Sequence, residues 1–537
     1  MILIIPTAGL ATRMQPLSYG IPKVLVVHHD KPLIDYILLS YQHISLKKVI
    51  LVIAPGQREL FEPILAAYEL QYCIELVEQS SPLGLLDATF SALSSIGYQE
   101  PVIVHLADAI FEKPFQQTDF EHSFVTLRQV LADQVGHWCM VDVCQGVASA
   151  FDDKPKQSKW RSAITGVYYF SNPQVLKDAV RGVMSDQEAR DKGNISALLA
   201  EYAPSCPLKA FYRDDWHDMG TLQHMHQHVF QHYLDGHAVQ QKGQQIVKSG
   251  DSLAMKNELF YYQFCLVPEC FPRIQKLGQN QIAMDYIPAR SLASYLLWQP
   301  LATDSIEYIN ASFWQWIEEH FYHHLPPVPG GYYLAETAIM YGERIIDRVE
   351  SWRLKLSDQD QQDLFGDIIK VNGQLLQGWG QLRDQVRLRS QYLAKTAVIR
   401  HIHGDLHCAN ILYSPEPHLF TLLDPRGAWG NEQSIWGDIR YDAAKFLHSF
   451  HGSYEYIKNR LSHYEQLSDK SYILQFPLAR VKEAQWLDHF CSRWRVKQKD
   501  ILWIEALCLL SISKFYQDLT LQKQFFLQGL ILLNSLL

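Results

Sequence analysis

Two separate segments of the chain carry residue types and spacings that suit nucleotide phosphates. The first is Ala8–Arg13, a loop of small residues that ends in a cation, and Lys23 follows it. Small residues let backbone N–H groups approach a triphosphate, and the two cations orient it and stabilise charge that develops during displacement. The loop directly follows the apolar run Ile2–Ile5, the position at which open α/β sheets bind ligands. This segment therefore predicts chemistry on a nucleoside triphosphate.

The second segment is His401–Leu412, in which Asp405 and Asn410 stand in a His-Gly-Asp-x-His-x-x-Asn pattern. Asp424 follows and begins an Asp-Pro-Arg-Gly run. Phosphoryl transfer from ATP needs one carboxylate that accepts or orients the hydroxyl proton of the acceptor, and an Asn and a second carboxylate that fix Mg²⁺ on the phosphates. Asp405, Asn410 and Asp424 suit those roles in that order. Arg426 is a candidate contact for a phosphate or an acidic substrate.

Ordered matches extend the first segment into a family resemblance. The loop together with Pro22 and Lys23 resembles the G-x-G-T-R…P-K signature of the sugar-1-phosphate nucleotidyltransferases, typified by glucose-1-phosphate thymidylyltransferase, with Ala11 in place of the second glycine. Further matches continue to about residue 221: Gln79 with Pro82–Leu85, Leu106–Phe111, Asp153–Pro155, Ala163–Tyr168 and Trp216–Thr221. Matches in the family's order are more specific than any single motif.

The resemblance implies three sets of site residues. The nucleotide-binding set contains small loop residues and two residues at the nucleobase: Ala8, Gly9, Ala11, Thr12, Gln79 and Gly84. The set that holds the sugar phosphate contains Asp153, Lys154, Thr165 and Gly166. Asp108 and Asp218 would bind one Mg²⁺ between them, because hard carboxylate oxygens suit this ion. Arg13 and Lys23 would be catalytic, since they favour in-line attack of a sugar or alcohol phosphate on the α-phosphorus while pyrophosphate departs.

The second segment resembles the aminoglycoside phosphotransferase and choline kinase group, a small-molecule branch of the protein-kinase-like fold. The resemblance implies that Lys248 is the ATP-binding lysine and that Glu258, on the next helix, is its ion-pair partner. It also implies that Met284 and Tyr286 lie in a hinge that meets adenine and that Asp442 is structural. The sequence contains no convincing glycine-rich loop over the phosphates, so we expect an abbreviated small lobe.

The elements expected around the first site form an α/β domain. Short β-branched runs alternate with helical patterns over the first 230 residues. The runs that read as strands are Ile2–Ile5, Lys48–Ile53, Tyr72–Val77, Pro101–Leu106 and Ala163–Phe170. This alternation of strands and helices predicts a doubly wound, Rossmann-like sheet.

A polar stretch rich in His and Gln, His224–Gln245, separates the two halves. We place a nucleotidyltransferase domain at 1–235 and a kinase domain at 236–537. The second domain is predicted to be a two-lobed, protein-kinase-like α+β domain, with a small lobe at about 243–290 and a helical lobe at about 291–537. Its small lobe should contain a strand near Gln244–Lys248, a helix near Asn257–Gln263 and a strand that reaches Ile287.

Bulk properties agree with two globular domains. A chain of 537 residues exceeds one ordinary core, and 47% hydrophobic residues can fill two. The net charge of -9 argues against a nucleic-acid or anionic-membrane binder. Nine scattered cysteines without a CxxC pair indicate reduced thiols. His224, His228 and His232 recur every four residues, which favours a solvated helix face over a metal site.

The chain start lacks the basic and apolar regions of a signal peptide, and no apolar run approaches the roughly 20 residues of a spanning helix. We therefore expect a cytoplasmic protein without membrane insertion. The sequence sets no oligomeric state.

The two predicted activities form one pathway if the kinase product is the phosphate that the nucleotidyltransferase uses. ATP would phosphorylate a small sugar or alcohol at Asp405, and the product would attack CTP, UTP or dTTP near Arg13 and Lys23. The result would be an NDP-sugar for surface polysaccharide such as capsule or lipopolysaccharide. Two alternatives stay open: a choline or polyol kinase fused to a CTP:phosphocholine cytidylyltransferase, and a regulatory protein that binds nucleotides without catalysis.

Overall fold

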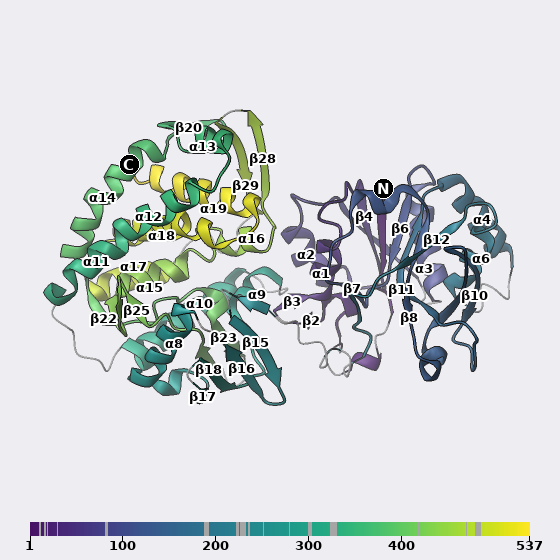
Figure 1. Cartoon of the computed structure of the whole chain (residues 1–537), viewed down its shortest axis with the longest axis horizontal. Coiled ribbons are helices and arrows are strands. Elements are labelled where there is room, and N and C mark those ends of the chain that lie inside the picture. The colour runs from purple at the N-terminus through teal and green to yellow at the C-terminus, as the bar shows by residue number, and fades with distance from the viewer. Residues whose placement is uncertain are drawn as a thin grey trace. The chain divides into compact units, whose positions relative to one another are not determined.

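The structure is a computed structural model of the chain (Figure 1). It describes residues 1–9, 12–15, 18, 20–28, 30–80, 84–186, 193–221, 225, 232–234, 237–250, 252–278, 280–298, 303–322, 330–415, 419–468, 470–477 and 485–537. The chain divides into two compact units, unit 1 at Met1–Val229 and unit 2 at Phe230–Leu537. The predicted domain boundary at 235 and 236 lies a few residues beyond this division.

Unit 1 is built on a nine-stranded mixed sheet with the order β5-β4-β1-β6-β11-β8-β12-β10-β9. Its strands are β1 (Ile2–Pro6), β4 (Lys48–Ile53), β5 (Ile74–Glu78), β6 (Val102–His105), β8 (Phe124–Gln129), β9 (Cys139–Cys144), β10 (Val147–Asp153), β11 (Ser162–Phe170) and β12 (Leu208–Tyr212). The first four in this order pair in parallel, and β11 joins β6 antiparallel. Continuous apolar runs suit these strands because parallel sheets are buried on both faces.

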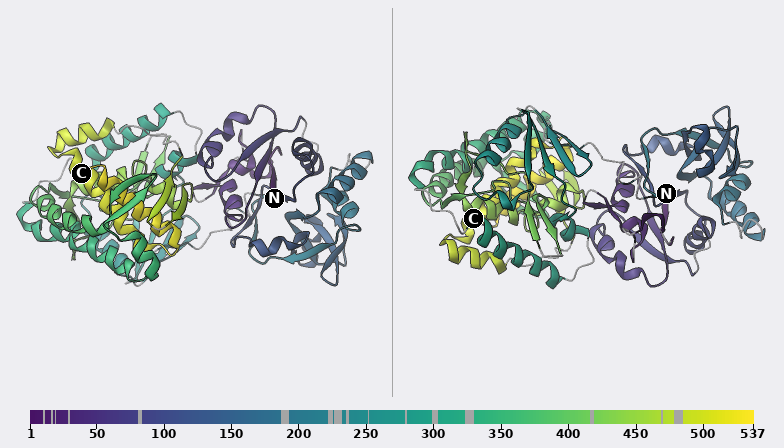
Figure 2. Two further views of the ribbon diagram at one scale, coloured as in Figure 1. Left: turned by 90° about the horizontal axis from the view of Figure 1, so that it is seen from above. Right: turned by 90° about the horizontal axis from the view of Figure 1, so that it is seen from below.

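Helices cover both faces of this sheet, as Figures 1 and 2 show. They are α1 (Leu33–Leu39), α2 (Glu62–Ala67), α3 (Leu85–Ile96), α4 (Pro173–Ser185) and α6 (Ile195–Tyr202). Two short strand pairs stand beside the sheet, β2 (Val27–His28) with β3 (Lys31–Pro32) and β7 (Ala109–Phe111) with β13 (Trp216–Asp218). The predicted Rossmann-like fold is confirmed for this part of the chain. The second strand pair positions the first candidate site.

Unit 2 opens with a five-stranded antiparallel sheet of order β14-β15-β16-β18-β17. Its strands are β14 (His232–Leu234), β15 (His237–Lys242), β16 (Gln245–Ser249), β17 (Ile274–Gly278) and β18 (Gln281–Asp285), and α8 (Leu253–Phe264) follows β16. The second predicted strand of the small lobe ends at Asp285 instead of Ile287. His232 pairs with Val239 in a hairpin, so the predicted helix is wrong at this histidine. His224 and His228 lie outside the described residues.

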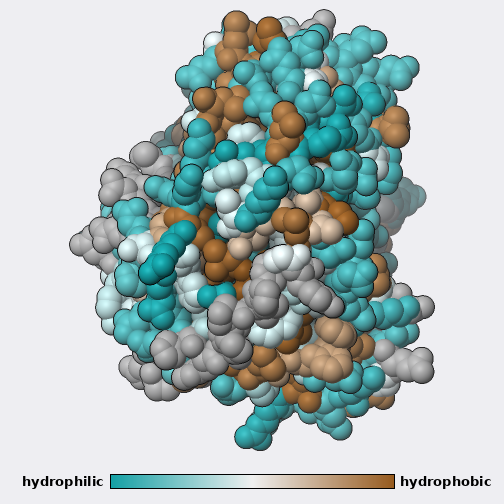
Figure 3. Space-filling view, turned by 90° about the vertical axis from the view of Figure 1, so that its left-hand side faces the viewer, coloured by the Kyte–Doolittle hydropathy of each residue, from teal (hydrophilic) through white to brown (hydrophobic). Residues whose placement is uncertain are grey.

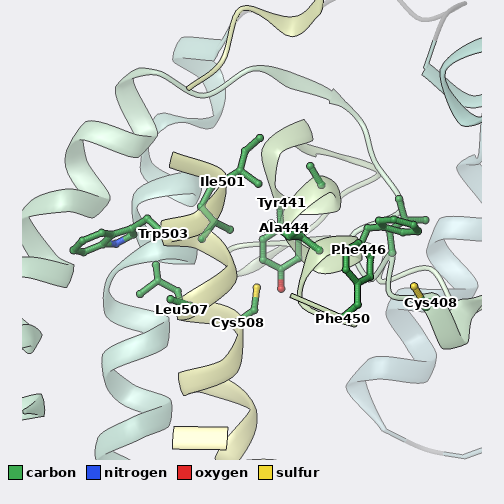
Figure 4. Close-up of a cluster of buried hydrophobic side chains, with 14 of the residues drawn as sticks. Cys408, Tyr441, Ala444, Phe446, Phe450, Ile501, Trp503, Leu507 and Cys508 are labelled. Atoms are coloured by element: carbon green, nitrogen blue, oxygen red, sulfur yellow. The ribbon is translucent and has the colours of Figure 1, made fainter. Parts of the chain in front are cut away.

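The rest of unit 2 is mostly helical. Its helices are α9 (Leu292–Trp298), α10 (Thr303–Ile317), α11 (Leu334–Tyr341), α12 (Glu343–Arg353), α13 (Asp358–Leu364), α14 (Trp379–Lys395), α15 (Ile439–Leu447), α16 (Tyr454–Lys458), α17 (Gln485–Trp494), α18 (Gln498–Ile512) and α19 (Leu519–Asn534). One large apolar core joins them, and α15 packs against α18 within it. Figure 4 shows this contact, with Tyr441 of α15 directed toward Cys508 of α18.

Short strands interrupt the helices of unit 2. Those near the second candidate site are β19 (Arg290–Ser291), β22 (Ile399–His401), β23 (Ile411–Ser414), β24 (Leu419–Leu422), β25 (Ala428–Trp429), β26 (Glu432–Gln433) and β27 (Trp436–Asp438). A further sheet of β20 (Ile368–Val371), β21 (Gln374–Gln377), β28 (His463–Ser468) and β29 (Ser471–Gln475) departs from the predicted helical remainder. Its first hairpin turns at Asn372-Gly373, a pair that favours two-residue hairpin loops.

Surface features agree with the bulk composition. On the face of unit 2 in Figure 3, hydrophilic residues predominate and apolar residues reach the surface among them. All nine cysteines are free. Within the described ranges, the helices are too short or too polar to cross a bilayer.

Candidate active sites

Strand pairing brings together the two aspartates predicted to bind metal in unit 1. Asp108 directly precedes β7, and β7 pairs antiparallel with β13 so that Asp218 lies opposite Ala109. The pairing continues beyond β13, where Met219 N donates to Asp108 O at 2.8 Å. Two residues that are 110 positions apart in the sequence therefore lie at one end of the same strand pair.

Gly220 shows how closely the two carboxylates approach each other. A Cβ atom added to Gly220 would lie 2.7 Å from Asp218 Oδ1 and 3.1 Å from Asp108 Oδ2. Gly220 N also donates to Asp218 Oδ1 at 2.7 Å. This oxygen-only pair fits Mg²⁺, which binds one or two carboxylates together with water and substrate phosphate oxygens. The site would be completed by such ligands, because the described residues contain no cluster of three potential metal-ligating side chains.

Lys23 is bonded directly to Asp108, where it forms a short ion pair with Oδ2. Lys23 begins a 3₁₀ turn after Pro22 and is only partly exposed. Burial alone would raise the pKa of Asp108, but the charge and hydrogen bond of Lys23 and the charge of Arg13 bring it below its ordinary value. The structure thus pairs Lys23 with an ionised aspartate, and the charge of Arg13 acts on the same carboxylate.

The small-residue loop leaves space near the end of β1. Ala8 is buried, whereas no atom lies within 4 Å of the Cβ position of Gly9. The loop is anchored by the Thr7 hydroxyl, which donates to Val52 O at 2.7 Å. Thr12 and Arg13 are exposed in the following 3₁₀ turn. Ala11 lies outside the described residues.

The predicted nucleobase residues lie at the end of β5 and the start of α3. Gln79 is buried, and its Nε2 donates to Asp87 Oδ2 at 2.7 Å. Gly84 immediately precedes α3 and is packed against the backbone of Gly193. Asp87 therefore fixes the amide of Gln79, and the nucleobase role of Gln79 and Gly84 stays a prediction.

Thr165 in β11 has a buried hydroxyl with no hydrogen-bond partner among the described residues. Buried hydroxyl groups are almost always hydrogen-bonded, so an unpartnered one indicates a place for a ligand or water. The register of β11 shifts between Ile164 and Tyr168, and Gly166 within this irregular segment lies against Ala109 and Leu106. Thr165 and Gly166 are thus next to the residues that flank Asp108.

Asp153 and Lys154 stand at the end of β10. Asn194 Nδ2 donates to Asp153 Oδ2 at 2.8 Å, and Lys154 N donates to Trp138 O at 3.0 Å. Burial raises the pKa of Tyr168 well above its ordinary value, and the charges of Asp153 and Asp108 add to this shift. Both aspartates therefore act electrostatically on one buried phenol of β11, and the role of Asp153 and Lys154 at a sugar phosphate stays a prediction.

The loop that carries Asp405 in unit 2 is held by a buried carboxylate. Asp442 of α15 accepts hydrogen bonds from His403 N at 2.8 Å, Gly404 N at 2.8 Å and the Tyr322 hydroxyl at 2.8 Å. Burial raises the pKa of Asp442 to about 6, although these hydrogen bonds oppose the shift. Asp442 thus has a structural role in the position of Asp405.

Lys445 contacts the predicted catalytic base. Its Nζ lies 2.8 Å from Asp405 Oδ1, and His407 Nε2 lies 3.8 Å from Asp405 Oδ2. Burial would raise the pKa of Asp405, but the charges of Lys445 and His407 hold it far below its ordinary value. Asp405 is therefore ionised, as a proton acceptor must be.

Hydrogen bonds to backbone carbonyls connect the predicted Mg²⁺ residues of unit 2 to the loop of Asp405. Asn410 Nδ2 donates to Asp405 O at 2.9 Å, and Leu423 N donates to Asn410 O at 2.9 Å. Leu423 places the next residue, Asp424, beside this loop. Because Asn410 uses its amide nitrogen here, its amide oxygen is the atom available to Mg²⁺, and the 40% exposed carboxylate of Asp424 suits the same ion.

Lys248 joins the small sheet to this loop. Its Nζ lies 2.8 Å from Glu258 Oε2 and 2.9 Å from Asp424 Oδ1. Burial would lower the pKa of Lys248, but the charges of Asp424 and Glu258 raise it. Burial raises the pKa of Glu258 to about 7 despite its lysine partner. The structure therefore brings together three residues that the sequence separates by as many as 176 positions.

The remaining predicted residues of unit 2 lie nearby. Met284 packs in a small core with Met255 and Ile282, and Tyr286 is 45% exposed just after β18. Tyr286 N donates to Gln244 O at 2.8 Å. Met284 and Tyr286 therefore lie at the end of β18, and their contact with a nucleotide stays a prediction.

The predicted set omits Gly220, Asn194 and Lys445, although each contacts a predicted site residue. Gly220 stands within the recognised Trp216–Thr221 run, so the motif could have indicated it. Lys445 lies three positions after Asp442, a spacing that shares one helix face. No comparable signal marks Asn194, because only the packing of α6 brings it to Asp153.

Comparisons with known proteins agree with the geometry of unit 1. Residues 2–234 match the family model described as nucleotidyl transferase. A glucose-1-phosphate thymidylyltransferase of Mycolicibacterium smegmatis is 28% identical over 192 residues, which cover 33% of this chain and 66% of that protein. A protein of the same name from Xanthomonas campestris is 26% identical over 243 residues, with coverage of 42% and 78%.

Among solved structures, a UDP-glucose pyrophosphorylase from Acinetobacter baumannii is 19% identical, with coverage of 42% of this chain and 92% of that one and a TM-score of 0.35. The family match spans the parallel strands, the small-residue loop and both aspartates of the metal pair. Residues 2–234 of this chain are therefore a nucleotidyltransferase domain.

Proposed function

We propose that this chain is a bifunctional enzyme that phosphorylates a small sugar or alcohol with ATP and then converts the phosphate to an NDP-sugar. The observation that carries the proposal is that each unit assembles its own set of charged residues. Unit 1 joins Lys23 to Asp108 beside Asp218, and unit 2 joins Lys248 to Asp424 beside Asp405. The aminoglycoside phosphotransferase-like fold of unit 2 is part of this proposal.

In unit 1, a sugar phosphate would displace pyrophosphate from CTP, UTP or dTTP. The exposed backbone around Gly9 would face the triphosphate, and Arg13 and Lys23 would neutralise charge as pyrophosphate leaves. Lys154 would hold the phosphate of the sugar, while the unpartnered hydroxyl of Thr165 would bond to the sugar itself. Mg²⁺ bound to Asp108 and Asp218 would supply Lewis-acid stabilisation of the nucleotide phosphates.

In unit 2, Asp405 would accept or orient the proton of the acceptor hydroxyl as that oxygen bonds to the γ-phosphorus of ATP. The bond from the γ-phosphorus to the bridging oxygen breaks, and ADP leaves. Lys248 would bind the phosphates of ATP, and Asn410 and Asp424 would hold the Mg²⁺ that neutralises them. The ion pair with Lys445 supports this role because it keeps Asp405 ionised.

The two reactions have a natural order, kinase first and nucleotidyl transfer second, because the first product is the second substrate. The order of the units in the chain is the reverse. Covalent linkage raises the local concentration of the intermediate without any need for a direct channel. An NDP-sugar made in this way would serve as a precursor of surface polysaccharide such as capsule or lipopolysaccharide.

The proposal is tested by supplying the purified chain with ATP, each NTP and a panel of sugars, polyols and choline. Mass spectrometry would measure ADP, the phosphorylated acceptor and the NDP-linked product. Asp405→Asn should abolish the first product, yet retain the second when sugar phosphate is supplied. Asp108→Asn should do the reverse, and Asp384→Asn, at an exposed position on α14, is the control for both.

Three other outcomes of this experiment would change the acceptor, the residue assignments or the functional class in the proposal. Phosphocholine as the only acceptor of a nucleotidyl group would replace the sugar with choline. Activities that survive both substitutions would show that the residues are assigned wrongly, and the absence of both products would favour a nucleotide-binding regulatory protein.

A further inference from the structure

Arg426 lies against the catalytic loop of unit 2. Its N donates to His403 O at 2.9 Å, and a Cβ atom added to Gly404 would lie 2.8 Å from Arg426 Cβ. Its Nη1 donates to the Tyr441 hydroxyl at 2.9 Å, with Cζ 5.6 Å from the centroid of that ring. The backbone and the stem of Arg426 therefore lie against His403 and Gly404, which directly precede Asp405 in the chain, and its guanidinium lies next to Tyr441 of α15.

Tyr441 and Lys445 bring Arg426 and Asp405 to one face of α15. Tyr441 and Lys445 are four positions apart on α15, so their side chains are neighbours on the helix surface. Lys445 contacts Asp405 Oδ1 at 2.8 Å, while Tyr441 contacts Arg426. Figure 4 shows that the Tyr441 hydroxyl is directed away from α15 toward Cys508 of α18. Helix α15 therefore contacts both Asp405 and Arg426, and α18 packs against α15.

Arg348 of α12 is a second arginine that interacts electrostatically with Tyr441 and Asp405. Its Cζ lies 4.7 Å from the ring centroid of Phe515, the last residue of the 3₁₀ turn Ser513–Phe515 that follows α18. Burial lowers the pKa of Arg348, and the charges of Tyr441, Cys508 and Asp405 act against this shift. Tyr441 is thus common to the electrostatic surroundings of Arg348 and to the direct contacts of Arg426.

The cationic side chains near Asp405 differ in whether they have an acidic partner. Lys248 is matched by Glu258 and Asp424, and Lys445 is matched by Asp405. In the part of the chain that the structure describes, neither Arg348 nor Arg426 forms an ion pair with a carboxylate. A guanidinium presents planar donors that match a carboxylate or a phosphate. Two such groups without an acidic partner, one of which lies against the loop of Asp405, indicate a ligand that supplies the negative charge.

We infer that the phosphoryl acceptor of unit 2 is an anionic sugar, whose carboxylate or phosphate group is bound by Arg426 and Arg348 while its hydroxyl faces Asp405. This inference rests on the proposed kinase function. It disfavours cationic acceptors such as choline or an aminoglycoside, because their ammonium groups would meet two arginines. A kinase product of this kind carries two anionic groups, and the nucleotidyl transfer step would have to accept both.

Matched pairs of sugars test the inference in the full chain. Galacturonate and glucose 6-phosphate would be compared with galactose and glucose for ATP-dependent phosphorylation. The anionic members should be the better acceptors, and the one preferred identifies the charged group. Arg426→Gln should lower kcat/KM for that acceptor by at least about 30-fold, mostly through KM, because a buried charge contact is lost. KM for ATP should not change.

Two further variants sharpen this result. Arg348→Gln should also weaken the anionic acceptor and leave a neutral one unchanged. Arg387→Gln removes an exposed arginine of α14 that pairs with Glu343, so it is the matched control and should have no effect. Equal kcat/KM for wild type and Arg426→Gln, or preference for a neutral or cationic acceptor, would overturn the inference.

Calorimetry with inorganic phosphate separates this inference from the kinase proposal. Without ATP, the wild-type chain should bind phosphate and Arg426→Gln should bind it at least about 10-fold more weakly. Equal binding by the two proteins overturns the anion site even if the kinase is active. Phosphorylation that persists in Asp405→Asn overturns the kinase assignment, whatever happens at Arg426.

Discussion

The two units position their carboxylates by different means. In unit 1, the pairing of β7 with β13 brings Asp108 and Asp218 to one glycine, where an added Cβ would contact both. In unit 2, Asp405 and Asp424 contact separate lysines, each 8% exposed at the side chain. The first arrangement depends on space between converging oxygens, and the second depends on buried opposite charges. Added volume should therefore damage unit 1, and lost charge should damage unit 2.

The largest effect expected from this comparison is on the stability of unit 2. Asp442→Ala leaves the backbone N–H groups of His403 and Gly404 without their acceptor and removes the partner of Tyr322. Loss of such a buried network should cost about 3–5 kcal/mol of the free energy of unfolding. Urea denaturation monitored by the Trp residues measures this cost. Asp347→Ala, at an exposed position on α12, should cost less than about 0.5 kcal/mol.

The nucleotidyltransferase activity of Asp442→Ala should be near that of the wild type at a denaturant concentration that inactivates the proposed kinase of unit 2. Equal losses of both activities would show that the stability of unit 1 depends on unit 2, and the comparison would then fail.

Removal of charge at Asp405, the proposed catalytic base of unit 2, should have the next largest effect. Lys445→Met leaves burial to raise the pKa of Asp405 without its main opposing charge. Kinase kcat should fall about 10²–10³-fold at neutral pH, the range typical for loss of a functional general base. The acidic limb of the pH profile should move to higher pH, since Asp405 must be ionised.

Lys395→Met is the matched control, because Lys395 is exposed at the end of α14. A lower kcat with an unshifted pH profile would mean that Lys445 acts on the transferred phosphate instead of on Asp405.

Added volume tests unit 1. Gly220→Ala places a Cβ atom at 2.7 Å from Asp218 Oδ1 and 3.1 Å from Asp108 Oδ2, so at least one carboxylate must move. Nucleotidyltransferase activity should fall about 100-fold, as expected for a misplacement near 1 Å. The Mg²⁺ concentration for half-maximal activity should rise, and kinase activity should be unchanged. Gly278→Ala is the control, because no atom lies within 4 Å of its Cβ position.

The smallest expected effect is the contribution of Asp442 to the pH dependence of stability. Its pKa in the folded chain is about 6, above the ordinary value of 3.8, so the folded state binds more protons between these values. The stabilising contribution is present below pH about 4 and is lost as pH rises through about 6. The difference in unfolding free energy between wild type and Asp442→Asn should therefore decrease by about 2–3 kcal/mol over this interval. A pH-independent difference would contradict the raised pKa.

Local sequence predicted the parts of both sites that depend on one segment. The strand Lys48–Ile53 has its predicted bounds, since a continuous β-branched run suits a buried parallel strand. The loop of Arg13 follows β1 as expected. The same local reasoning failed at His232, where pairing with Val239 replaces the predicted helix. It also missed the sheet of β20, β21, β28 and β29, because residues 378–462 separate its two hairpins and only the folded chain brings the hairpins together.

The sequence by itself determined which residue types are present for each reaction: two cations and two aspartates in unit 1, and the Asp-Asn-Asp set with a lysine in unit 2. Spacing and order along the chain carry this information. Only the tertiary structure decided which of these charges meet, because strand register and helix packing join residues more than 100 positions apart. That step added Gly220 next to both aspartates, Lys445 on Asp405, and two arginines without an acidic partner among the described residues.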